Sequence, residues 1–139
     1  MDYFFKCMTE KYATFSGRAI RKEYWMFFLI MMICYAIAIA LDMTWGLWDD
    51  KESIGVVSGI LVLVFILPYL AVTVRRFHDT NRTGWWLVIP YIPMIPGALA
   101  FDAFPIIGFI FFISAFILVI ASFVFLCLKS DPQANQYGS

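Results

Sequence analysis

Residues 74–86 read VRRFHDTNRTGWW and place three arginines, the histidine and an aspartate between two long apolar runs. The upstream run, 54–74, and the downstream run, 85–101, contain no charged residue. A short charged segment between uncharged runs of this length is typical of a loop that joins two membrane spans. The stretch therefore predicts a membrane protein in which residues 75–84 form a loop at one membrane surface.

The composition of the whole chain agrees with that prediction. Of its 139 residues, 63% are hydrophobic and 14% are charged, and the mean hydropathy is +0.82. A soluble domain of this length could not bury so much apolar surface. The net charge of zero and the lack of a basic run predict no binding to nucleic acid. Cys7, Cys34 and Cys127 share no disulfide or metal-site spacing.

Four apolar runs are long enough to cross a bilayer, at about 24–42, 54–74, 85–101 and 105–128. The third run contains Pro90, Pro93 and Pro96, which predict a broken helix because proline lacks a backbone donor. We therefore predict an all-α integral membrane protein, a small bundle of four transmembrane helices in a single membrane domain, 1–139.

The segment 1–16 precedes these spans and has a helical pattern of its own. Phe4, Met8, Tyr12 and Phe15 recur at spacings that place them on one face of a helix. The pattern predicts an N-terminal helix that lies in the membrane interface or, equally, packs on the rest of the protein.

Basic residues are distributed unevenly between the two predicted sides. Four spans place both termini and the loop 75–84 on one side, which carries every lysine and arginine except Lys51. Because cytoplasmic loops carry an excess of basic residues, both termini are predicted to be cytoplasmic.

Two motifs and the tail resemble a known family. They are FSGRAIRKEYW at Phe15–Trp25, RRFHDTNRTGWW at Arg75–Trp86, and the closing Asn135–Gly138. Their order and spacing are similar to those of the bacterial family called domain of unknown function 805, over essentially the whole chain. The resemblance implies a small protein of the inner (plasma) membrane, and it implies no activity. The segment before the tail is longer here than in familiar members and includes Asp102.

The histidine and its neighbour are the first candidates for chemistry. A histidine beside an aspartate can act as a base with an orienting carboxylate. The sequence places no nucleophile near His78 and Asp79, and adjacent side chains tend to point apart. Metal sites need ligand clusters, which are lacking. We therefore predict no catalytic residue, no metal and no cofactor.

The basic residues of the two motifs are candidates for binding an anion or a lipid headgroup, because arginine suits bidentate phosphate binding. The candidate binding residues are Arg18, Arg21, Lys22, Arg75, Arg76, His78 and Arg82. The alternative interpretation is that these charges only set topology beside anionic lipid.

The two acids of the motifs are expected to form structural ion pairs, because an unpaired charge near hydrocarbon is costly. Glu23 is expected to pair with Arg75, Arg76 or Arg82. Asp79 is expected to pair with Arg18 or Arg21.

The leading functional hypothesis is a non-enzymatic membrane protein whose cytoplasmic face contacts anionic lipid or a protein partner. A transport or channel subunit is the alternative, supported by the proline-broken third span. A lipid-acting enzyme using His78 and Asp79 is a third hypothesis. Gly55 and Gly59 form a G-x-x-x-G motif that marks either a homo-oligomer interface or internal packing.

Overall fold

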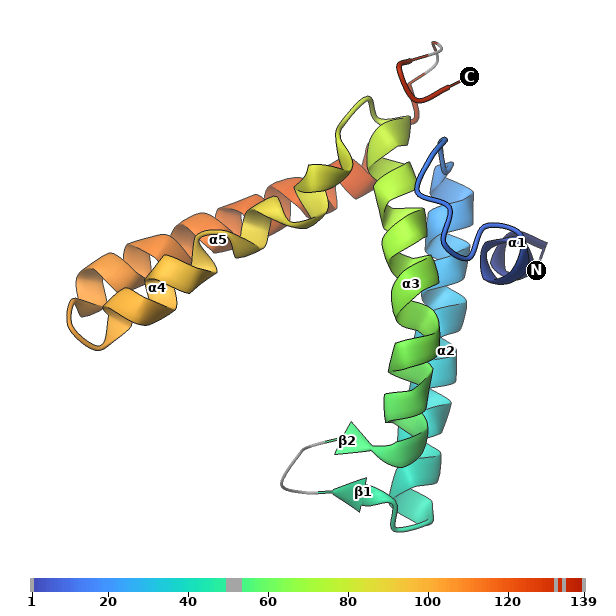
Figure 1. Cartoon of the computed structure of the whole chain (residues 1–139), viewed down its shortest axis with the longest axis horizontal. Coiled ribbons are helices and arrows are strands. Elements are labelled where there is room, and N and C mark those ends of the chain that lie inside the picture. Colours follow the sequence, from blue (N-terminus) through green and yellow to red (C-terminus); the bar gives the residue numbers. More distant parts are fainter. Residues whose placement is uncertain (1, 50–53, 132, 134, 139) are drawn as a thin grey trace. The chain divides into compact units, whose positions relative to one another are not determined.

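The computed structural model describes residues 2–49, 54–131, 133 and 135–138, and these are mostly helical (Figure 1). The helices are α1 Asp2–Thr9, α2 Arg21–Thr44, α3 Val56–Asp79, α4 Met94–Phe101 and α5 Pro105–Cys127, with 3₁₀ turns η1 Gly84–Leu87 and η2 Ile89–Tyr91. Two two-residue strands, β1 Trp48–Asp49 and β2 Ile54–Gly55, pair antiparallel.

Three helices, α2, α3 and α5, are long and apolar enough to cross a membrane. The most apolar 18-residue stretch of α2, α3 and α5 has a mean hydropathy of 2.3, 2.5 and 2.9, respectively. At 1.5 Å per residue, each of these helices is roughly 35 Å long. The predicted third span consists of η1, η2 and the short α4. Proline removes backbone donors there, at positions 90, 93 and 96, which agrees with the predicted break. A fourth crossing stays a prediction.

The chain divides into two compact units. The first comprises residues 1–15 and 22–72, and therefore α1, most of α2 and most of α3. The second comprises residues 16–21 and 73–139, and therefore joins the segment before α2 to the end of α3 and everything that follows.

In the first unit α1 packs on α2 and α3 through its aromatic face. The ring of Phe4 stacks on Phe27 at 5.5 Å between centroids and lies 6.1 Å from Phe65. Glu23, at the start of α2, accepts a hydrogen bond from the Cys7 thiol. These contacts agree with the packing interpretation of the N-terminal segment, and its place in a membrane stays a prediction.

Pro68 lies inside α3 and leaves one backbone carbonyl, that of Val64, without its helical donor. The hydroxyl of Tyr12 donates to this carbonyl at 2.7 Å. A residue 52 positions upstream thus supplies the hydrogen bond that the proline removes.

At the opposite end of the first unit, the end of α2 meets the start of α3, beside the paired strands β1 and β2 (Figure 1). Asp42 is fully buried, and its carboxylate accepts from the backbone N–H groups of Val57 and Ser58, both at 2.8 Å. It therefore caps the first turn of α3 from the end of α2. A Cβ on Gly55 would lie 2.1 Å from Asp42 Oδ2, so only glycine leaves room for the carboxylate.

In the second unit, the segment 84–101 and α5 pack against each other as an antiparallel hairpin. Near one end, the Ser122 hydroxyl donates to the Trp86 carbonyl at 3.2 Å. Near the other, Gly97 and Gly108 allow close approach, since a Cβ on Gly108 would lie 2.9 Å from the Cα of Phe101. The hairpin is therefore in contact along most of its length.

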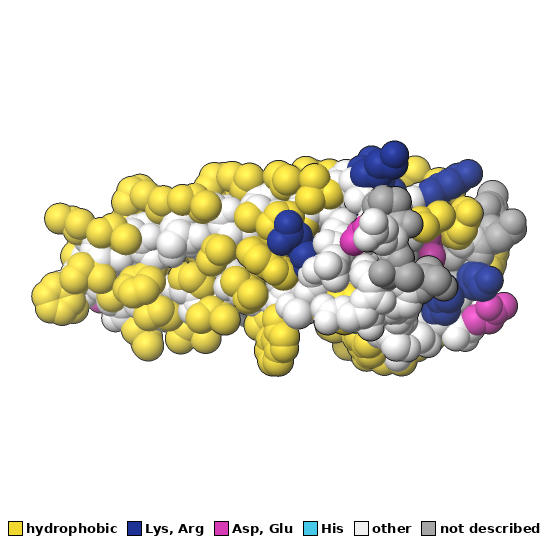
Figure 2. All heavy atoms as spheres, turned by 90° about the horizontal axis from the view of Figure 1, so that it is seen from above, with side chains coloured by type: hydrophobic (Ala, Val, Ile, Leu, Met, Phe, Trp, Pro, Cys, Tyr) yellow, Lys and Arg dark blue, Asp and Glu magenta, His cyan; other side chains and the backbone are white. Residues whose placement is uncertain are grey.

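Most of the helical surface is hydrophobic. In Figure 2, most basic and acidic side chains in view lie in one part of the face, and hydrophobic side chains predominate elsewhere. Many large apolar side chains are more than half exposed, such as Leu63, Leu99 and Ile106 at 72%, 79% and 79%. Surface of this kind is suited to contact with lipid.

Candidate functional site

The candidate site is built around the end of α3, which extends further than the sequence predicted. Residues 75–79 of the predicted loop are helical, so the connection to η1 is shorter than 75–84. Asn81 has a left-handed backbone (φ 56°), and the N–H of Arg82 donates to the carbonyl of Phe77 at 3.0 Å. This is the usual way in which a helix ends while its last carbonyls keep partners. It brings the basic residues of the motif onto helical turns.

Asp79 is the acid at the centre of the site, and its side chain is only 2% exposed. Arg18 Nε lies 3.0 Å from Asp79 Oδ1, and Arg76 pairs with Asp79 Oδ2. Of the two arginines expected to pair with Asp79, the structure brings Arg18 to it. Arg76, three residues away on the same helix, is a second partner that the sequence analysis did not name.

Arg76 is fully buried, and its donors are directed at protein acceptors. Nε donates to the carbonyl of Leu126 at 3.0 Å, an Nη donates to that of Leu128, and another Nη donates to that of Ala19 at 3.4 Å. The first two acceptors lie at the end of α5, where carbonyls lack helical partners and carry partial negative charge. Arg76 therefore joins α3, α5 and the segment before α2.

Arg18 holds the tail of the chain. Besides Asp79, its guanidinium donates to the carbonyls of Asp131 at 2.5 Å and Gln133 at 2.9 Å. The backbone N–H of Asp131 in turn donates to the carbonyl of Asp79 at 3.0 Å. The tail thus lies against both members of the ion pair.

The segment before α2 and the tail both contact His78. Its Nδ1 lies 3.2 Å from the Gly17 carbonyl, and since a carbonyl only accepts, Nδ1 carries the proton of this hydrogen bond. The ring of Tyr137 stacks on the imidazole at 3.8 Å with an angle of 2°. Asn135 donates to the backbone carbonyl of His78 at 2.9 Å. The geometry therefore gives His78 a packing role beside the tail.

The remaining candidate residues are placed differently. Arg75 is buried, and its carbonyl accepts from the Ala19 N–H at 3.0 Å. Arg21 is exposed, and its Nε donates to Leu128 at 2.6 Å. In the first unit, Lys22 is exposed, with its Nζ 5.9 Å from the ring centroid of Tyr3.

Glu23 has a partner that the sequence did not suggest. Lys11 Nζ lies 3.7 Å from its Oε1, in addition to the contact with the Cys7 thiol. Pairing of Glu23 with one of the arginines named for it stays a prediction.

Arg82 is half-buried and lies over aromatic rings. Its guanidinium carbon is 3.5 Å from the centroid of Phe125 and 5.9 Å from that of Trp86. Its Nε is buried with no hydrogen-bond partner among the described residues. Arg82 therefore differs from Arg18 and Arg76, whose donors have named acceptors.

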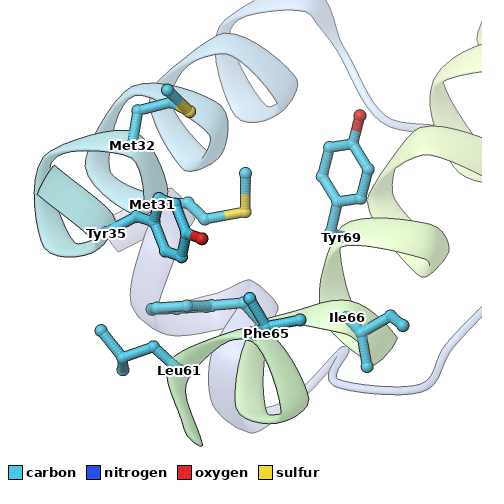
Figure 3. A pocket seen from close by; sticks show the side chains of 8 residues that line it. Met31, Met32, Tyr35, Leu61, Phe65, Ile66 and Tyr69 are labelled. Carbon is cyan, nitrogen blue, oxygen red and sulfur yellow. The ribbon is translucent and has the colours of Figure 1, made fainter. Parts of the chain in front are cut away.

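The first unit contains an apolar cavity of about 290 Å³ between α2 and α3. Figure 3 shows the lining side chains, which α2 supplies as Met31, Met32 and Tyr35 and α3 as Leu61, Phe65, Ile66 and Tyr69. None of the described residues that line this cavity is charged. Among the described residues, no group of three or more His, Cys, Asp or Glu could hold a metal ion.

Sequence reasoning missed the part that the tail plays. Among the described tail residues, the side chains of Asn135 and Tyr137 contact His78, and the backbone contacts Arg18 and Asp79, all more than 50 positions upstream. The signal was present, because the tail motif accompanies the other two motifs in the family resemblance. A short polar tail, however, has no periodicity from which its partners can be read.

Comparisons with known proteins agree with the resemblance. A family model described as "Protein of unknown function (DUF805)" matches residues 12–139. The chain is 40% identical to "Inner membrane protein YhaH" of Escherichia coli (strain K12) over 95 residues, which are 68% of this chain and 77% of that protein. It is 34% identical to "Inner membrane protein YhaI" of the same strain over 130 residues, 94% of this chain and 87% of that protein. No solved structure matches the chain.

Proposed function

This chain belongs to the family described as "Protein of unknown function (DUF805)", and on that premise we propose that it is a multi-pass protein of the bacterial inner membrane. The names of its relatives support the location. Three helices of membrane-spanning length and polarity support more than one crossing.

We propose four crossings with both termini in the cytoplasm. Arg18, before α2, contacts Asp79 at the end of α3 and the tail carbonyls after α5. If these sites share one membrane surface, the chain between α3 and the tail must cross and return. With the 3₁₀ turns at about 2.0 Å per residue and the rest at about 1.5 Å, residues 84–101 extend roughly 30 Å, the thickness of the hydrocarbon core.

Reporter fusions test this topology. A fusion after Ser139 is expected to report the cytoplasm, and a fusion in the segment 50–53 is expected to report the outer side. An outer C-terminus would contradict four crossings and would leave α2, α3 and α5 as the spans.

The proposed role is non-enzymatic: the cytoplasmic end of the second unit contacts anionic lipid headgroups. The supporting observation is an imbalance of charge. Asp79 is the counter-charge of both Arg18 and Arg76. Of the other basic residues in this unit, Arg21 and Lys129 are exposed and Arg82 is half-buried. Anionic headgroups are the counter-charges that a cytoplasmic membrane surface supplies, at about 1 kcal/mol per basic residue.

The lipid that stays with the purified protein tests the role. Protein extracted in mild detergent is expected to retain phosphatidylglycerol and cardiolipin in excess over their share of the source membrane. A variant with Arg21→Gln and Lys129→Gln is expected to lose part of that excess. Retained lipid with the composition of the source membrane would contradict the proposed role.

A further inference from the structure

Arg82 is a cation for which the described part of the protein supplies no counter-charge. Arg18, Arg21 and Arg76 each donate to identified acceptors. The Arg82 side chain makes no hydrogen bond or ion pair with a described residue, and its Nε is buried without a partner. The two Nη atoms are not among the buried atoms that lack a partner, so they are the part of the guanidinium that an acceptor from outside the chain can reach. Because an unsatisfied charged donor is costly, such an acceptor would be favourable.

The flat face of the Arg82 guanidinium packs against aromatic rings. The guanidinium carbon lies 3.5 Å above Phe125, and the indole of Trp86 meets Phe125 edge to face at 4.7 Å. The backbone of Trp86 is itself held by the Ser122 hydroxyl. Stacking on rings uses the face of the guanidinium and leaves the N–H groups on its edge for another acceptor.

The surroundings of Arg82 indicate the depth of the site. Phe125 lies in the last turn of α5, which ends at Cys127 and is followed by the exposed Lys129. Trp85, next to Trp86, is 70% exposed. Tryptophan and basic residues at the end of an apolar helix are typical of the layer in which lipid headgroups lie.

We propose that Arg82, stacked on Phe125 beside Trp86, binds the phosphate group of an anionic ligand through the two Nη groups of its guanidinium. The proposal rests on the proposed contact with anionic lipid and assigns a residue to it. Arginine is suited to this task because its planar fork matches two phosphate oxygens. A lipid headgroup and free phosphate share this chemistry, so the experiment separates the two sources.

The experiment measures the thermal midpoint of the full chain in detergent as ligand is added. A ligand that binds the folded state raises the midpoint, so the dependence on concentration gives an apparent Kd. The ligands are phosphatidylglycerol, phosphatidylcholine as the zwitterionic reference, and inorganic phosphate. The proteins are the natural chain, Arg82→Gln, Arg82→Lys, and Lys129→Gln as a matched loss of one positive charge.

The natural chain is expected to respond to phosphatidylglycerol more than to phosphatidylcholine. Arg82→Gln is expected to weaken this binding by about tenfold or more, since it removes charge-assisted hydrogen bonds. Arg82→Lys is expected to recover only part of it, because an ammonium lacks the fork. Lys129→Gln is expected to change it by less than Arg82→Gln. Each shift is measured from the variant's own midpoint, so a lower basal stability does not imitate lost binding.

The outcomes separate the two proposals. If the natural chain does not distinguish the two lipids and does not respond to inorganic phosphate, both the proposed role and the site at Arg82 fail. If it prefers phosphatidylglycerol but Arg82→Gln and Lys129→Gln weaken binding equally, the role stands and the site at Arg82 is overturned. A response to inorganic phosphate that Arg82→Gln abolishes supports the site and identifies free phosphate as a source.

Discussion

The two ends of α3 each bury an aspartate, and they satisfy it in opposite ways. Asp42 meets the N-terminal end with neutral donors, namely two backbone N–H groups of the first turn. Asp79, at the C-terminal end, is paired with the guanidinium groups of Arg18 and Arg76. The difference follows from the helix itself, which presents free N–H groups at its start and free carbonyls at its end.

The consequence is a local contact at one end and a junction at the other. Asp42 connects two helices that are consecutive in the chain. Asp79 and its two arginines connect α3 with the segment before α2, the end of α5 and the tail. Because arginine has several donors, one carboxylate can hold a cluster that also serves the carbonyls of other segments. The loss of Asp79 should therefore affect more of the chain than the loss of Asp42.

The largest effect is expected for Asp79→Asn. The change keeps the shape but leaves the buried Arg76 without a counter-charge, which should lower the free energy of unfolding by about 3–5 kcal/mol. Chemical or thermal unfolding in detergent measures it. The control is Asp102→Asn, which alters an exposed acid. If the two variants lose equal amounts of unfolding free energy, Asp79 does not hold the segments of the chain together.

Gly55→Ala should have the next largest effect, at the other end of α3. The new methyl would overlap the Asp42 carboxylate, and overpacking of this kind costs about 1–3 kcal/mol. The double variant Asp42→Gly with Gly55→Ala removes all three overlapping atoms of residue 42, namely Oδ2, Cγ and Cβ, so its loss should be smaller than the sum of the single losses. Strict additivity would contradict the contact. A change in oligomeric mass with Gly55→Ala would instead favour the G-x-x-x-G interface.

Asp42→Asn sharpens the comparison of the two carboxylates directly. An asparagine oxygen can still accept one hydrogen bond from the first turn of α3, so the loss should be about 1–2 kcal/mol. The measurement is the unfolding free energy of Asp42→Asn beside that of Asp79→Asn. A loss at Asp42 as large as that at Asp79 would show that guanidinium partners make the second carboxylate no more critical than the first.

The smallest effect is expected for Tyr137→Ala, which removes the stack on His78 and leaves the ion pairs in place. An aromatic stack of this kind contributes about 0.5–1.5 kcal/mol. Proteolysis of the tail should become faster while global unfolding changes little, because the tail would open locally. Tyr91→Ala, at an exposed tyrosine, is the control. Unchanged proteolysis in Tyr137→Ala would mean that the stack does not hold the tail.

The features that the sequence alone determined are those that depend on neighbouring residues. The apolar runs predicted the three long helices because a helix keeps its backbone hydrogen bonds within its own segment. The prolines predicted the broken stretch at 85–101. The acid and the arginines of the two motifs predicted a contact between Asp79 and the segment before α2, since a buried carboxylate needs a cation.

The tertiary structure alone decided which distant residues form hydrogen bonds with each buried polar group. Arg76 donates to carbonyls of Leu126 and Leu128, 50 and 52 positions away, and a carbonyl that lacks a partner cannot be identified by its residue type. Asp42 is the last residue of the predicted span 24–42, and only the fold places it against Gly55 and the first turn of α3. Tyr12 replaces the donor that Pro68 lacks. Such hydrogen bonds depend on where two backbones meet, which the packing of whole helices determines and no local pattern encodes.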